Sequence, residues 1–188
     1  MNTSYIIIGI IGLIILWIIV VYNGLITLHN RVKEAWSDIS VQLKRRYDLI
    51  PNLIETVKGY SKFEKSVLTD VTKARTEAMN AQGVEDKAKG ENMLTDALKS
   101  LFAVAESYPD LKASANFLDL QDELSDTENK IEASRRFYNG QVRDFNTKLE
   151  TFPTNTIGRQ LKFESQPFFE IEGEEAEKAK DAPKVEFE

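Results

Sequence analysis

The chain has 188 residues, a formal net charge of −6 and no cysteine. Its length is about that of one domain, and the absence of cysteine excludes disulfides, thiolate zinc sites and cysteine nucleophiles. There is one histidine, His29, so sites built on several histidines are excluded as well.

The negative charge is concentrated near the C-terminus. After Phe163 the chain carries nine acidic residues and three lysines, and the part before it holds 21 acidic and 21 basic residues. The sequence shows no one-sided basic face of the kind that binds nucleic-acid phosphates. We therefore expect no nucleic-acid partner.

The first predicted element is a transmembrane anchor within residues 1–26. Residues 5–22 contain no charged residue, and eighteen helical residues reach about 27 Å, enough for the core of a bilayer. Tyr5 and Tyr22 lie where the two interfaces would fall. The alternative is a cleaved signal peptide, which fits poorly because no Lys or Arg precedes the run and no small-x-small site follows it. We expect residues 5–22 to contact the lipid bilayer.

Flanking charges predict the orientation of this anchor. The four residues before the run carry no Lys or Arg, whereas Arg31 and Lys33 follow it closely. The cation-rich side normally stays in the cytoplasm. The prediction is a single-pass protein of the plasma or inner membrane, with its N-terminus outside and its body in the cytoplasm.

The body, residues 27–152, has apolar residues at helical spacing throughout and no lasting strand-like alternation. Pro51 is expected to kink the first helix, and Ser61 and Glu64 form a capping box before the second. The expected helices cover residues 32–58 (continuous with the anchor), 61–80, 85–107 and 111–151. The predicted fold class is all-α: a transmembrane helix followed by an antiparallel up-and-down four-helix bundle with coiled-coil-like spacing.

Three polar residues interrupt the apolar seams of the first and last helices. Arg46 lies on the first seam and Glu128 and Arg135 on the last, near positions that face each other in an antiparallel pair, with Gln121 as a fourth candidate. A buried charge requires partners, so we expect a polar network of these residues. It could fix the helix register or form a functional site, or the seam could rotate and expose these groups to water.

Catalytic, cofactor and metal sites are not indicated. A di-metal carboxylate bundle needs Glu-x-x-His motifs on two helices, and no Glu lies three residues before His29. The sequence also lacks a Gly-rich phosphate loop and a nucleophile elbow. We expect a protein without enzymatic activity.

Two segments follow the body. Residues 153–172 are rich in aromatic residues and either pack against the end of the bundle or contact the membrane surface. The candidates for membrane contact are Arg159, Lys162, Phe163, Phe168 and Phe169. Residues 173–188 are acidic and are predicted to be disordered, although Val185 and Phe187 could dock.

Several short motifs resemble the LemA family of bacterial membrane proteins. They lie in the same order along nearly the whole chain and include Ala35-Trp36, Asp48-Leu-Ile-Pro-Asn-Leu53, Tyr108-Pro-Asp-Leu-Lys112, Tyr138-Asn139, Phe152-Pro153, Phe168-Phe169 and Val185-Glu-Phe187. The resemblance implies a single N-terminal anchor carrying a helical bundle. The resemblance implies no catalytic residue in this chain. It suggests a membrane zinc metallopeptidase as one class of protein partner.

The function expected from these features is that of a membrane-anchored scaffold or adaptor that binds another membrane or envelope protein. The alternative is a membrane-organising or envelope-maintenance protein that acts directly on lipid. An exposed apolar stripe on the second or third helix would favour the scaffold.

Overall fold

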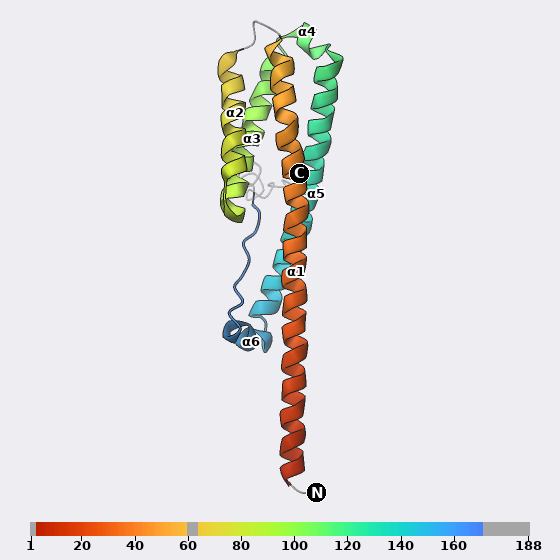
Figure 1. Cartoon of the computed structure of the whole chain (residues 1–188), viewed down its shortest axis with the longest axis vertical. Helices are drawn as coiled ribbons and strands as arrows, with labels where there is room; N and C mark the ends of the chain where they lie inside the picture. The colour runs from red at the N-terminus through yellow and green to blue at the C-terminus, as the bar shows by residue number, and fades with distance from the viewer. Residues whose placement is uncertain (1–2, 60–63, 171–188) are drawn as a thin grey trace, which may run out of the picture. The chain divides into compact units, whose positions relative to one another are not determined.

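The computed structural model describes residues 3–59 and 64–170, and all regular elements in these ranges are helices (Figure 1). The helices, in chain order, are α1 (Thr3–Lys58), α2 (Lys65–Asn80), α3 (Gly83–Ala105), α4 (Pro109–Lys112), α5 (Ala115–Glu150) and α6 (Thr154–Gln160). The chain divides into two compact units. Among the described residues, the anchor unit comprises residues 3–40 and 133–167, and the bundle unit comprises residues 41–59, 64–132 and 168–170.

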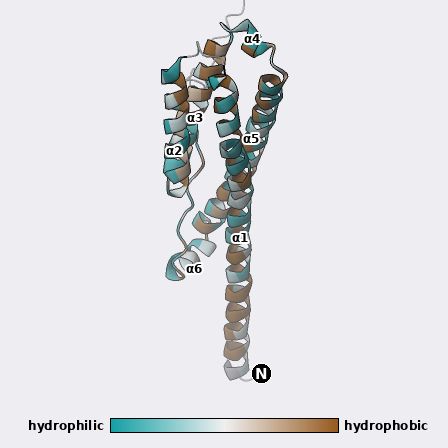
Figure 2. Ribbon diagram, turned by 45° about the horizontal axis from the view of Figure 1, so that its top comes forward, coloured by the Kyte–Doolittle hydropathy of each residue, from teal (hydrophilic) through white to brown (hydrophobic). Residues whose placement is uncertain are grey.

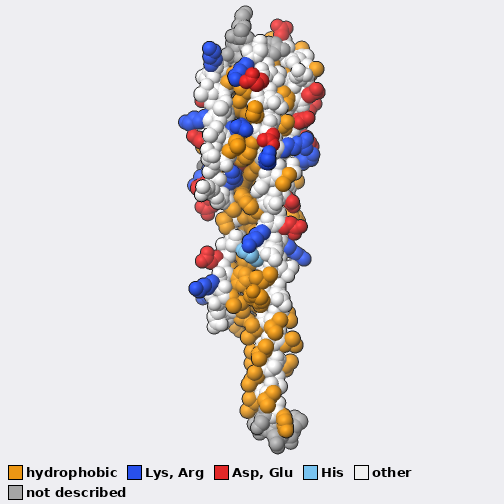
Figure 3. All heavy atoms as spheres, in the orientation of Figure 1, with side chains coloured by type: hydrophobic (Ala, Val, Ile, Leu, Met, Phe, Trp, Pro, Cys, Tyr) orange, Lys and Arg blue, Asp and Glu red, His pale blue; other side chains and the backbone are white. Residues whose placement is uncertain are grey.

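Helix α1 is one uninterrupted helix that includes both the apolar run and the first helix of the body. Its N-terminal part is long and apolar enough to cross a membrane. In Figure 2 the ribbon of this part is coloured hydrophobic along its length. Figure 3 shows hydrophobic side chains covering it on the visible face, with the charged side chains further along the chain. The helix continues through Pro51, whose ring lies on an exposed position.

In the anchor unit, α1 and the C-terminal part of α5 pack antiparallel. The ring of Trp36 lies 5.4 Å from that of Tyr138, and the ring of His29, two turns earlier in α1, lies 5.5 Å from that of Phe145, two turns later in α5. The two helices therefore pair with opposite directions. Burial follows the apolar seam of α5, where Val142, Phe145 and Leu149 are all buried along with Tyr138.

In the bundle unit, residues 41–58 of α1 pack with α2, α3 and the N-terminal part of α5. Arg75 Nε on α2 donates a hydrogen bond of 2.8 Å to the carbonyl oxygen of Tyr47 on α1. The rings of Phe102 on α3 and Phe117 on α5 are 6.0 Å apart. Helices α2 and α3 approach each other closely at Gly90, where a Cβ would lie 2.8 Å from the Cα of Ala78.

The predicted fold class is confirmed: the chain is all-α, with a long apolar N-terminal helix followed by an antiparallel helical bundle. The helix boundaries differ in detail, because the turn at Pro109 forms the short helix α4 and the last long helix begins at Ala115 instead of residue 111. Helix α6 was not expected. The Ser61 side of the capping box and the tail from residue 171 lie outside the described residues. Glu64 is the N-cap of α2 but makes no side-chain capping bond.

Candidate functional site

A cluster of ionisable side chains lies inside the bundle unit, centred on Arg46 of α1. Its Nη1 atom is 3.3 Å from Glu91 Oε2 on α3 and 3.2 Å from Glu128 Oε2 on α5. Nη2 donates a hydrogen bond of 2.8 Å to Thr95 Oγ1. The hydroxyl of Tyr47 donates to the other carboxylate oxygen of Glu91. Arg46 thus connects three helices through charge-assisted bonds.

Glu91 is the most enclosed acid of this cluster, with 2% of its side chain exposed. Burial raises the pKa of its carboxyl, and the hydrogen bond from Tyr47 and the charge of Arg46 oppose this rise. Burial and the neighbouring Glu91 raise the pKa of the Tyr47 hydroxyl, so Tyr47 stays protonated and acts as a donor. The charges and hydroxyl groups of Arg46, Glu91 and Tyr47 are therefore paired within the cluster.

A pocket of about 280 Å³ opens beside Arg46 between α3 and α5. It brings together Arg46, Gln121 and Glu128, three of the residues singled out in the sequence, along with Thr95 of the same cluster. Glu128 is 42% exposed and faces partly to solvent. Arg135 is half-buried in the anchor unit, and its participation in the network stays a prediction.

Sequence reasoning missed Glu91, although a signal for it exists. Leu94, Leu98 and Leu101 are the expected core positions of α3 and are all buried. Glu91 precedes Leu94 by three residues and therefore continues the same alternation of three- and four-residue steps. An acid on an apolar seam predicts a buried partner, and Arg46 is that partner here.

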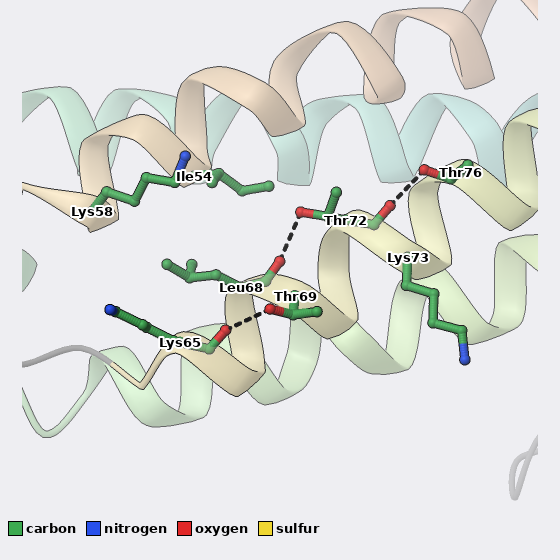
Figure 4. A pocket seen from close by; sticks show the side chains of 8 residues that line it. All are labelled: Ile54, Lys58, Lys65, Leu68, Thr69, Thr72, Lys73 and Thr76. Carbon is green, nitrogen blue, oxygen red and sulfur yellow. Dashed lines mark hydrogen bonds between the residues drawn. The ribbon is translucent and has the colours of Figure 1, made fainter.

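A second feature of the bundle unit is a groove of about 660 Å³ between α1 and α2 (Figure 4). Ile54 of α1 and Leu68 of α2 form its apolar floor. Lys58 and Lys65 lie on either side of Leu68 in Figure 4, one from each helix, and Lys73 lies further along α2. The lining residues include three lysines and no acid, while Glu55 and Glu77 next to the groove lie 2.6 Å from Lys58 Nζ and 3.9 Å from Lys73 Nζ.

The wall of this groove consists of three threonines of α2. The hydroxyls of Thr69, Thr72 and Thr76 each donate to the backbone carbonyl four residues earlier (Figure 4). Their hydroxyl protons are therefore unavailable to a ligand. The groove offers methyl groups, aliphatic carbon and ammonium groups, a combination suited to a segment with both apolar and acidic side chains.

In the anchor unit, the segment after α5 returns to α1 near the end of the apolar run. The ring of Phe163 lies 6.5 Å from that of Tyr22, 6.2 Å from that of His29 and 6.3 Å from that of Phe145. The two hydrogen bonds between Asn146 and the backbone of Gln166, both 2.9 Å long, hold the segment on α5. Of the two alternatives for residues 153–172, this packing favours contact with the helices for Phe163.

The exposure of the other aromatic residues corrects part of the expectation. Phe169 is 1% exposed, so its ring is packed inside the folded chain and is not presented to a membrane surface. Phe152, expected on the buried seam of the last helix, is instead 80% exposed, because α5 ends at Glu150. Phe168 is 40% exposed and Leu161 is 45% exposed.

Comparison with known proteins agrees with these features. The profile of the LemA family matches residues 35–187. The chain belongs to the LemA family. It is 32% identical to Protein LemA of Metamycoplasma hominis over 153 residues, which cover 79% of this chain and 68% of that protein.

This LemA family protein also resembles two magnetosome proteins. It is 21% identical to Magnetosome protein MamQ of Magnetospirillum gryphiswaldense and 23% identical to Magnetosome protein MamQ 2 of Paramagnetospirillum magneticum. Each match covers 79% of this chain and 64% of the relative, so the chain spans less than two thirds of either MamQ protein. None of these three relatives has the name of an enzyme.

Within residues 3–59 and 64–170, no group of three or more His, Asp or Glu side chains is arranged to hold a metal ion. The ring of His29 packs against Phe145 and Phe163, and the residue is half-buried. Burial and the nearby charge of Lys33 lower the pKa of the His29 imidazole. His29 is therefore a side chain that packs between α1 and the aromatic residues Phe145 and Phe163.

Proposed function

We propose that this LemA family protein is a membrane-anchored helical scaffold that binds another membrane or envelope protein and has no catalytic activity of its own. The observation that carries the proposal is the groove between α1 and α2, which combines an apolar floor with a basic rim. The cluster around Arg46 agrees with it, because these ions pair with one another and the groove lies apart from them on the bundle unit.

The expected partner carries a short segment with acidic and apolar side chains that fits this groove. A membrane zinc metallopeptidase is one partner class, suggested by the family resemblance alone. Charge complementarity between partner and groove would contribute mainly to the association rate and to specificity.

Site-specific photocrosslinking in native membranes tests this role. A photoreactive residue at Thr72, in the groove, should capture a discrete membrane protein, whereas one at the exposed Asp122 of α5 should not. The double variant Lys58→Glu/Lys65→Glu should abolish the capture. The matched control Lys89→Glu/Lys148→Glu makes the same change in net charge on exposed positions and should leave it intact. Equal capture from Thr72 and Asp122, or recovery of lipid alone, would contradict the scaffold.

Lipid contact is the second candidate, and it is favoured by one feature of the anchor unit. Phe152 and Leu161 are exposed on either side of α6, beside the exposed cations Arg159 and Lys162. Gly158 of α6 lies close to Leu25 of α1, just past the apolar run. Exposed apolar and basic side chains at this level of α1 suit an anionic membrane surface.

Reconstitution into vesicles tests this second role. Quenching of a fluorophore at residue 160 by lipids brominated near the headgroup should be strong in vesicles that contain anionic lipid. The variant Phe152→Ser/Leu161→Ser should weaken it, whereas Leu118→Ser, an exposed leucine of α5, should not. If quenching is the same in the native chain and the variant, and the same with and without anionic lipid, the proposed lipid contact is wrong.

The proposed orientation, with the bundle in the cytoplasm, can be tested because the chain has no cysteine of its own. A cysteine added after Glu188 should react with a membrane-impermeant maleimide only after the cells are opened. Labelling in intact cells would reverse the proposed topology.

A further inference from the structure

The groove between α1 and α2 matches one segment of the chain itself in charge and pattern. Residues 171–188 carry seven acidic residues and three lysines, whereas the groove is lined by three lysines and no acid. The chain ends in Val185-Glu186-Phe187-Glu188, which alternates apolar and acidic side chains. We propose that this C-terminal segment is an intramolecular ligand of the groove.

The alternation of the last four residues fits the chemistry of the groove. In an extended backbone, Val185 and Phe187 would face one side and Glu186 and Glu188 the other. The apolar side suits the floor at Leu68 and the threonine methyl groups. The acidic side and the terminal carboxylate suit the basic rim.

The electrostatics of α2 add to this attraction. Lys65 is the first residue of α2 and follows the N-cap Glu64, and the first turn after this cap contains no acidic residue. The positive end of the helix dipole lies at this end of α2, so an anionic segment there would be attracted by the dipole and by Lys65, against the charge of the exposed Glu64. Exposed ion pairs of this kind contribute little individually, so several must act together.

The C-terminal segment is also long enough to reach the groove, and it follows a residue of the same unit. The last described residue, Glu170, belongs to the bundle unit, which is the unit that carries the groove. The eighteen residues that follow could span about 60 Å when extended, whereas α2 is about 24 Å long. The family match continues to residue 187 and so includes Val185 and Phe187.

This inference concerns an internal ligand and does not require that the scaffold role be correct. If both hold, a protein partner must displace residues 171–188 from the groove. Removal of residues 173–188 would then increase the capture of a partner from Thr72. If no partner is captured from Thr72 in either form of the chain, the scaffold proposal fails, and the inference about the C-terminal segment is judged by the disulfide experiment below.

Disulfide trapping in the full-length protein, reconstituted in vesicles, tests the inference directly. Cysteines at Thr69, in the groove, and at Lys184, just before the apolar-acidic alternation, should form an intramolecular disulfide under mild oxidation. The control pair joins Lys184 to the exposed Asp122 of α5 and should form the bond at least tenfold more slowly. Adding Phe187→Ser to the Thr69 pair should slow the bond as well.

Charge reversal and rescue exclude a nonspecific encounter. Lys58→Glu/Lys65→Glu should slow the bond between residues 69 and 184 by about five- to tenfold, and adding Glu186→Lys/Glu188→Lys should restore most of the rate. Equal rates for the two cysteine pairs would overturn the inference. A bond that forms only between two copies of the chain would overturn it too, as would a failure of the rescue.

Discussion

The two units of this protein hold their helices together with different chemistry. In the anchor unit, α1 and α5 meet through aromatic rings, with Trp36 against Tyr138 and His29 against Phe145. In the bundle unit, the same two helices meet at an ion pair, Arg46 with Glu128. Apolar contacts tolerate small shifts, whereas a buried charge demands a partner at a defined position. The bundle unit should therefore respond more strongly to single changes in its core.

The largest effect is expected for Glu91→Ala. The change leaves Arg46, which is 3% exposed, with only the partly exposed Glu128 as a charged partner, and it removes the acceptor of Tyr47. The free energy of unfolding should fall by about 3–5 kcal/mol, measured by chemical denaturation of the full chain in detergent. Hydrogen exchange should show that the loss of protection is greatest in α2 and α3.

Two controls bound this effect. Glu123→Ala changes an exposed glutamate of α5 and should alter the free energy of unfolding by no more than about 0.5 kcal/mol. Glu128→Ala should lower it by about 1 kcal/mol, since Glu128 is 42% exposed and Arg46 keeps Glu91. If Glu91→Ala behaved like Glu123→Ala, the cluster would not stabilise the fold.

Gly90→Ala should have the next largest effect. A Cβ at residue 90 would lie 2.8 Å from the Cα of Ala78, and a backbone atom cannot move aside without separating α2 from α3. A loss of about 1–3 kcal/mol is expected from such overpacking, visible as a lower Tm. Gly158→Ala in the anchor unit is the comparison, because its added methyl meets flexible side chains, those of Leu149 and Leu25, and no backbone atom. A larger loss for Gly158→Ala would reverse the ranking of the two units.

Tyr138→Phe should weaken the anchor unit by only about 1 kcal/mol. The change removes the hydrogen bond of 2.9 Å from the Tyr138 hydroxyl to the carbonyl of Pro167, and the ring remains beside Trp36. Trp36 fluorescence, recorded in a Trp17→Phe background, should report an earlier unfolding midpoint with little change in the folded spectrum. A changed folded spectrum would show that the hydroxyl, and not the ring, sets the packing.

The smallest expected signal is a difference in pH dependence between the native protein and Glu91→Gln. Burial raises the pKa of Glu91 in the folded state above its ordinary value of 4.5. The folded chain therefore binds more protons at this site than the unfolded chain, and stability falls as the pH rises from about 4.5 through the folded pKa. Denaturation from pH 4.5 upward should show a steeper loss for the native protein than for Glu91→Gln. If the stability of the native protein instead rose with pH relative to Glu91→Gln, the charge of Arg46 would lower the pKa of Glu91 by more than burial raises it.

The helical architecture could be predicted because it depends on local pattern. Apolar residues at three- and four-residue steps define α1, α2, α3 and α5, and the eighteen-residue apolar run sets a single long helix at the N-terminus. The same steps placed Phe117, Leu124 and Ile131 in the core of the bundle unit, and all three are buried.

The partners of the polar residues were harder to predict, because they lie on helices far apart in the sequence. Position on the seam indicated that Arg46 needs a partner, but the carboxylate of Glu91 is 45 residues away. That Arg46 pairs with Glu91 as well as with Glu128 depends on how α3 and α5 pack against α1 in three dimensions. Likewise, only the end of α5 at Glu150 explains why Phe152 is exposed.

The sequence by itself determined the class of this protein, since the apolar run, the seams and the LemA motifs are local features that any packing must satisfy. The tertiary structure alone decided which groups meet: the closure of the Arg46 cluster by Glu91, the packing of Phe163 on His29, and the groove between α1 and α2. The physical reason is that helix formation depends on neighbours along the chain. Burial, ion pairing and groove shape depend on which helices approach each other and at what register.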